Sequence, residues 1–166
     1  MLKIIKYPNE ILTEQLPNFD FENPTEDPKQ LEQEMFETLF STEYGVGLAA
    51  NQVGKRVRMF IMGHKSEPEK GTAFFNPIIL ANSDVLVDSE EGCLSFPNVY
   101  VKVKRPEGIL AQWQNSSGEV QKGEFYGFDC RCFLHEFDHL EGIVYRDRIS
   151  PLKWALAVKK SIKRKF

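Results

Sequence analysis

Residues 135–139, with the sequence H-E-F-D-H, constrain this chain more than any other feature. Residues four apart lie on one face of an α-helix, so His135 and His139 can reach one metal ion. The carboxylate of Glu136 lies near enough to that face to act as general base on a metal-bound water, the expected nucleophile. Two of the chain's three histidines fall in this motif. The alternative is that the motif binds no metal and consists of two buried histidines beside a salt-bridged glutamate.

A catalytic metal site needs a third protein ligand. Tyr145 occupies the position at which one class of metalloprotease has a third histidine. After His139 the only acids are Glu141 and Asp147, which lie in or beside the turn that ends the helix. The third ligand is therefore expected upstream, and the candidates are an acid, His64, Cys93 and Cys132.

The three named candidates differ in their surroundings. His64 lies in a polar loop and is expected to be solvated. Cys132 is one helical turn before His135, too close in sequence for a comfortable tetrahedron, and is expected in the wall of a pocket. Cys93 follows a glycine and precedes a short apolar stretch. A thiolate offered there from a strand or its edge would fit a site with two histidines and one cysteine.

Hydrophobic periodicity predicts an α+β fold, with antiparallel sheets packed around the central helix that contains H-E-x-x-H. A helix is expected from Pro28, capped by Asp27, with its pattern ending at Gly45, and another after Pro151 at the C-terminus. The central helix should span residues 130–140, with Asp129 as its N-cap. Strands are expected within residues 56–61, 73–80, 85–87, 99–104, 109–114 and 119–126, the last two forming a hairpin.

Composition limits the classes of protein to which the chain can belong. Its 166 residues suggest a single domain, residues 1–166. No apolar run exceeds seven residues, whereas a membrane-spanning helix needs about 20, so no membrane partner is expected. Three cysteines are too few for a disulfide scaffold and favour a reducing cytosol. The N-terminus lacks the apolar core of a secretory signal.

Charge is unevenly distributed along the chain. Residues 148–166 include seven basic side chains and no acidic one, whereas the preceding residues include 24 acidic and 14 basic side chains. A basic tail on an acidic body suggests an anionic partner for the tail. The simpler interpretation is an amphipathic helix that packs on the body with a solvated basic face.

Three segments, in order, resemble the motifs of the peptide deformylase family. That family has G-x-G-x-A-A-x-Q, then E-G-C-x-S, then Q-H-E-x-D-H. Residues 45–52 (GVGLAANQ), 91–95 (EGCLS) and 135–139 match these patterns, at similar separations. The chain differs at Leu134, where the family usually has glutamine, and at Tyr100 and its neighbours, where bacterial relatives often have an arginine.

The resemblance implies hydrolysis of the formyl group from the N-formylmethionine of newly made polypeptides. It implies that Cys93, His135 and His139 bind one divalent metal ion, with Fe(II) as the working ion and Zn, Ni or Co as alternatives. Glu136 would be the general acid and base. Arg105 is a candidate partner for Glu91, with a solvated surface arginine as the alternative.

The remaining implied roles concern the substrate. The side chain of Gln52 and the backbone N–H of Leu94 would stabilise the oxyanion. Val46 and Gly47 would line the substrate cleft, with Gly47 meeting the peptide backbone. Read alone, the segment from Gly45 is better explained as a helix end followed by a turn, and Gln52 as a surface amide; the three motifs together reverse that preference.

The resemblance also bears on partners and location. N-formylmethionyl polypeptides are the implied substrates, and the basic C-terminal helix is a candidate for docking to the ribosome, as in bacterial relatives. No DNA partner is expected. The cytoplasm of a bacterial or phage-infected cell, or an organelle after processing, would fit. A non-catalytic binder of formylated nascent peptides and a general metallopeptidase are the alternative functions.

Overall fold

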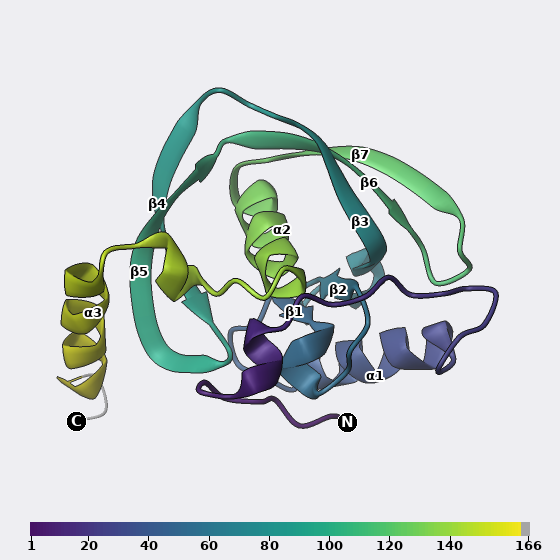
Figure 1. Cartoon of the computed structure of the whole chain (residues 1–166), viewed down its shortest axis with the longest axis horizontal. Helices are drawn as coiled ribbons and strands as arrows, with labels where there is room; N and C mark the ends of the chain where they lie inside the picture. Colours follow the sequence, from purple (N-terminus) through teal and green to yellow (C-terminus); the bar gives the residue numbers. More distant parts are fainter. Residues whose placement is uncertain (164–166) are drawn as a thin grey trace.

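Helix α2 (Gly127–Leu140) lies in the middle of the fold, with the strands arching around it (Figure 1). The structure is a computed structural model that describes residues 1–163. Residues 164–166 of the predicted basic tail lie outside the described residues. The predicted α+β class, with antiparallel sheets around the helix that contains H-E-x-x-H, is confirmed.

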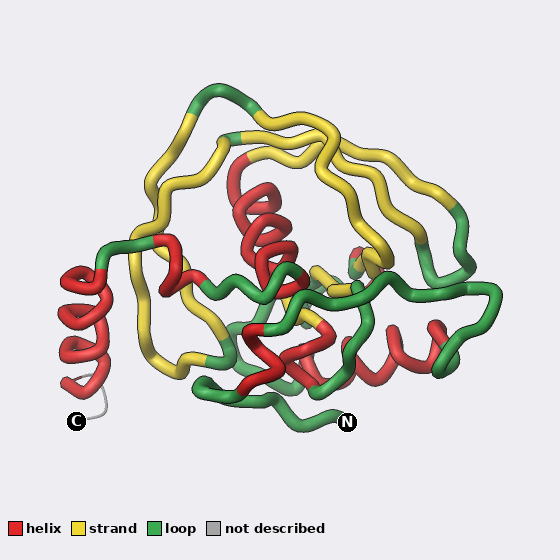
Figure 2. Tube along the Cα trace, viewed as in Figure 1, coloured by secondary structure: helices red, strands yellow, loops and turns green. Residues whose placement is uncertain are grey.

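The strands form two antiparallel sheets, drawn in yellow in Figure 2. The larger sheet has the order β1 (Gly47–Ala49), β2 (Met59–Met62), β3 (Thr72–Asn82), β6 (Gly108–Gln114) and β7 (Val120–Tyr126). The smaller sheet pairs β4 (Leu86–Cys93) with β5 (Phe96–Pro106). The predicted hairpin is β6–β7, and the short strand expected at residues 85–87 extends to Cys93 because it pairs along most of β5.

Helix α1 (Pro28–Phe40) begins where the sequence predicts. The Oδ1 of Asp27 accepts hydrogen bonds from the backbone N–H groups of Lys29, at 2.9 Å, and Gln30, at 3.4 Å. This N-cap satisfies donors that have no partner within the helix. The helix ends at Phe40, earlier than the expected end at Gly45.

Helix α2 begins earlier than predicted and ends as predicted. Its N-cap is Tyr126 rather than Asp129. Asp129 lies inside the first turn, where a negative charge interacts favourably with the helix dipole. Gly142 follows the helix end with φ +73°, and a Cβ there would lie 2.5 Å from the carbonyl oxygen of Thr13. The face of α2 with Phe133 packs in an apolar cluster with Phe60 and Phe74 from the larger sheet.

The smaller sheet has helix α3 (Pro151–Lys163) on its outer side (Figure 1). Strand β5 buries the apolar side chains of Val99, Val101 and Val103. Trp154 of α3 packs against Phe96 in the same cluster. Ala157 and Val158 of α3 join this cluster, whereas Leu152, Leu156 and Ile162 are exposed, so only part of the helix's apolar surface is packed. Within residues 1–163, no helix has the length and apolarity that crossing a membrane requires.

Four short 3-10 helices complete the described elements: η1 (Glu10–Thr13), η2 (Ala50–Val53), η3 (Pro68–Lys70) and η4 (Tyr145–Arg148). The turn η2 directly follows β1, so the segment from Gly47 to Gln52 runs as a buried edge strand and then a tight turn. The sequence suggested only a glycine-rich loop for the start of this segment.

Candidate active site

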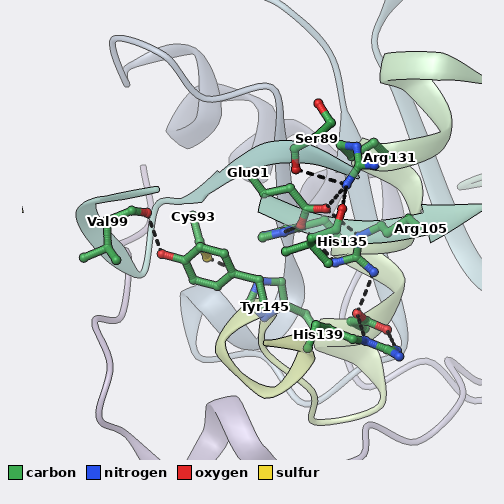
Figure 3. Close-up of polar contacts among 12 residues, drawn as sticks. Ser89, Glu91, Cys93, Val99, Arg105, Arg131, His135, His139 and Tyr145 are labelled. Carbon is green, nitrogen blue, oxygen red and sulfur yellow. Dashed lines mark hydrogen bonds and ion pairs between the residues drawn. The ribbon is translucent and has the colours of Figure 1, made fainter. Parts of the chain in front are cut away.

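Three side chains from distant parts of the chain converge beside α2 (Figure 3). Cys93 comes from the end of β4, and His135 and His139 come from adjacent turns of α2. Their ligand atoms all lie within 4.8 Å of one another, and Sγ of Cys93 lies 3.5 Å from Nε2 of His139. Of the other candidates, Cys132 lines the adjoining cleft, and His64 is exposed with its Nδ1 2.6 Å from Ser66 Oγ.

The donor set fits a divalent metal ion. A thiolate and two imidazoles suit Zn, Fe, Co or Ni. Nδ1 of His135 lies 2.9 Å from Oε1 of Glu91, which leaves Nε2 as the nitrogen available to a metal. Burial lowers the pKa of His139 well below its usual value, which favours the neutral, ligating form.

Glu136 is buried beside this cluster, with 4% of its surface exposed. Within the described residues, its Oε2 has no hydrogen-bond partner. Burial raises the pKa of Glu136 to about 7. A carboxyl group in this state is poised to exchange a proton near neutral pH.

Glu91 is the hub of a buried ion-pair network, drawn in Figure 3. Arg105 binds both carboxylate oxygens, at 2.6 and 2.9 Å, which confirms the predicted pair, and Arg131 adds a bond of 2.7 Å. Burial alone would raise the pKa of Glu91, but hydrogen bonds from His135 and Arg105 lower it to about 2. Arg131 was not predicted from the sequence, because no local pattern indicates a partner 40 residues away.

Gln52 is oriented toward the cluster by its own backbone turn. Its Oε1 accepts a hydrogen bond of 2.9 Å from the N–H of Ala49. The amide nitrogen is thereby turned toward Ser95 Oγ, at 3.1 Å, and Cys93 Sγ, at 3.5 Å. Gln52 is therefore a buried amide and not a surface one. Leu94 directly follows Cys93 in the sequence, and Leu94 lines the adjoining cleft.

The cleft beside the cluster has a volume of about 390 Å³. Its lining includes Val46, Gly47, Leu94, Cys132, His135 and Glu136. A Cβ on Gly47 would lie 2.9 Å from both Cys132 Sγ and Glu136 Oε1, so a side chain at this position would displace Cys132 and Glu136. Because β1 is an edge strand of its sheet, an extended peptide can pair with its backbone.

The family model for polypeptide deformylase matches residues 1–155. The chain belongs to the peptide deformylase family. Deformylation of polypeptides that begin with N-formylmethionine is the activity of this family, so the chain is a metal-dependent hydrolase. Deformylases use a single metal, and the cluster of Cys93, His135 and His139 is able to bind one.

Individual deformylases show the same relationship. The peptide deformylase of Thermotoga maritima is 43% identical over 135 residues, which cover 81% of this chain and 80% of that protein. The chloroplastic peptide deformylase 1B of rice is 38% identical over 90% of this chain, although the match spans only 55% of the rice protein. The crystal structure of a peptide deformylase from Legionella pneumophila superposes with a TM-score of 0.90 at 30% identity, covering 99% of this chain and 95% of the other.

Proposed function

We propose that this chain hydrolyses the formyl group of N-formylmethionyl polypeptides at the cluster of Cys93, His135 and His139. The observation that supports this most directly is the convergence of a thiol and two imidazoles beside the buried carboxyl of Glu136. We further propose that the three side chains hold one Fe(II) ion, with Zn, Ni and Co as alternatives compatible with the ligands.

Glu136 acts as general base and then as general acid in this proposal. A divalent cation at the three ligands would polarise the formyl carbonyl and lower the pKa of a water molecule from 15.7 to about 7. Glu136 accepts the proton of the attacking water and returns it to the leaving nitrogen of methionine. Its buried, unpartnered Oε2 is free to take that proton.

Gln52 and Leu94 stabilise the negative charge that develops on the formyl oxygen. The bond from Ala49 fixes the Gln52 amide with its NH₂ toward the cluster, so the donor is preorganised. The backbone N–H of Leu94 is the second proposed donor. A neutral amide donates without adding charge to the site, and one such donor typically contributes about 3–4 kcal/mol to lowering the barrier.

Val46 and Gly47 bind the peptide. Gly47 lies in the edge strand β1, where its lack of a side chain lets a peptide backbone approach Glu136 closely. The methionine side chain enters the adjoining cleft. Arg131 and Cys132 line this cleft together with Phe128.

The test is an assay of formyl-Met-Ala-Ser beside the same peptide without the formyl group. We expect release of formate from the first peptide and no cleavage of the second, because a peptide bound along Gly47 as proposed would bring its formyl carbon to the ligand cluster. Cleavage at an internal peptide bond would indicate a general metallopeptidase. Binding of the formylated peptide without formate release would indicate a non-catalytic binder. Either result would contradict the proposal.

We also propose that α3 docks to ribosomal RNA, and that the chain acts in a bacterial-type cytoplasm or an organelle. The bacterial and chloroplastic relatives support the proposed location. The exposed face of α3 includes the basic side chains Lys153, Lys159, Lys160 and Lys163. Phosphate contacts of such lysines weaken steeply as salt concentration rises.

Sedimentation with ribosomes tests the docking proposal. The chain is expected to pellet with ribosomes at 50 mM salt and to remain in the supernatant at several hundred millimolar salt. Exchange of Lys159, Lys160 and Lys163 for glutamate should abolish pelleting. Exchange of the exposed Lys122 on β7 should not. Pelleting that is unchanged by the α3 substitutions would contradict the proposal.

A further inference from the structure

Arg131 makes more contacts than the neutralisation of one carboxylate requires (Figure 3). Its Nη1 donates to Oε2 of Glu91 at 2.7 Å and to the carbonyl oxygen of Val103 at 2.8 Å. Its Nη2 donates to the carbonyl oxygen of Val87 at 2.7 Å, and Ser89 O lies 3.4 Å from Nη1. One guanidinium from α2 therefore binds the backbone of both β4 and β5.

The charge of Glu91 is already balanced without Arg131. Arg105 pairs with both oxygens of Glu91, and Arg105 itself is shared with Asp138 at 2.9 Å. Arg148 then balances Asp138 from the other side. Because the carboxylate has its bidentate partner in Arg105, the distinct contribution of Arg131 is the link to the strand backbone.

The smaller sheet needs such a link. A two-stranded hairpin is marginally stable by itself, and its position depends on what it packs against. Strand β4 contains Glu91 and ends at Cys93. The position of this strand therefore determines where the Cys93 thiol lies and where the carboxylate that bonds to His135 lies. Arg131 lies one helical turn before His135 on the same face of α2, so it reaches β4 beside the bond between His135 and Glu91.

We propose that Arg131 is a positioning residue that fastens β4 and β5 to α2 and so holds Glu91 against Nδ1 of His135. This inference rests on the proposed metal site. A carboxylate that accepts from the outer nitrogen of a ligating histidine fixes the orientation of the ring and strengthens metal binding. Arg131 contributes to metal binding through Glu91 and the strand, without touching the metal or the reacting atoms.

The affinity of the full chain for Co²⁺, measured by competition with a chelator, tests this inference independently of catalysis. Arg131→Met keeps an unbranched side chain like the aliphatic stem of arginine and removes the guanidinium donors. It is expected to weaken Co²⁺ binding about tenfold, within the range typical of lost outer partners of a metal ligand. Arg131→Lys keeps the charge and part of the hydrogen bonding, so we expect an intermediate affinity.

Arg148→Met is the matched control, because it removes a guanidinium from the other end of the same network without contacting Glu91. It is expected to lower the Tm but to leave Co²⁺ affinity within twofold of wild type. Wild-type affinity in both Arg131 variants, or an equal loss in Arg148→Met, would overturn the inference. If Arg131→Met does not fold, the comparison of Co²⁺ affinity between Arg131→Lys and Arg148→Met tests the inference. Failure of the wild-type chain to bind Co²⁺ would instead overturn the metal site itself.

Discussion

Replacing Glu136 with glutamine is expected to lower kcat for a formylated peptide by about 10³-fold, within the range for loss of a general acid and base. Glutamine has nearly the same size and shape as glutamate, so the packing beside Gly47 is kept. Its amide cannot accept the proton of the attacking water. Formate release under saturating substrate measures the effect, and KM is expected to change little.

Two measurements separate this effect from loss of the site. Bound metal per chain should match wild type, because no ligand atom changes in Glu136→Gln. Glu141→Gln is the matched control, since Glu141 follows the end of α2 and pairs with Arg58. It should keep wild-type kcat. A Glu136→Gln variant that retains more than about a tenth of wild-type kcat would refute the proposed role.

Replacing Cys93 with alanine is expected to remove bound metal and, with it, activity. Only two imidazoles would then remain of the three ligands, whereas a catalytic site of this type needs three. We expect metal affinity to fall by more than about 100-fold, beyond the loss typical of outer-shell substitutions. Metal content after anaerobic purification and formate release together measure the effect.

Cys130→Ala is the matched control for this truncation. Cys130 is buried in the apolar core near the start of α2, and its Sγ donates to the carbonyl oxygen of Pro106. This variant should keep its metal and its activity. Wild-type enzyme stripped with a chelator should recover when Fe(II) or Ni(II) is added, whereas Cys93→Ala should not. Full metal occupancy in Cys93→Ala would exclude the thiolate as a ligand.

The parts of the fold predicted well from the sequence have local signals. Asp27 and Pro28 mark the start of α1 because a cap and a first-turn proline act within a few residues. The turn around Gly118, with φ +81°, marks the β6–β7 hairpin in the same way. The apolar face of α2 follows the helical period over several turns, so its packing against the larger sheet was predictable.

The parts that were missed lack such signals. Strand β1 is three residues long and wholly buried, so no alternation of polar and apolar residues indicates it. Helix α2 starts at Gly127, where φ is +58°, and its N-cap Tyr126 has no side-chain capping bond that the sequence could suggest. Strand β2 begins at Met59, later than the alternation from Arg56 suggested.

The residues of the proposed metal site also differ in whether a local sequence signal indicates them. His135 and His139 were predicted from helical spacing, and their position together is confirmed. Cys93 could be placed beside them only by elimination and by the family resemblance, because it is 46 positions from His139 along the chain. The contacts of Arg131 with β4 and β5 depend on how two distant strands cross α2, which periodicity does not encode.

The separation of Cys93 from the two histidines has a consequence for unfolding. Strands β5, β6 and β7 lie between them, so an ion bound to all three side chains closes a long loop as a reversible cross-link. The unfolded chain cannot bring these groups together without paying the entropy of that closure. Binding of an ion by these three side chains would therefore be selective for the native state, and would add about 2.7 kcal/mol to the free energy of unfolding at a free concentration 100 times Kd. Scarcity of the ion in the cell would thus lower the equilibrium stability of the folded chain as well as stop its turnover.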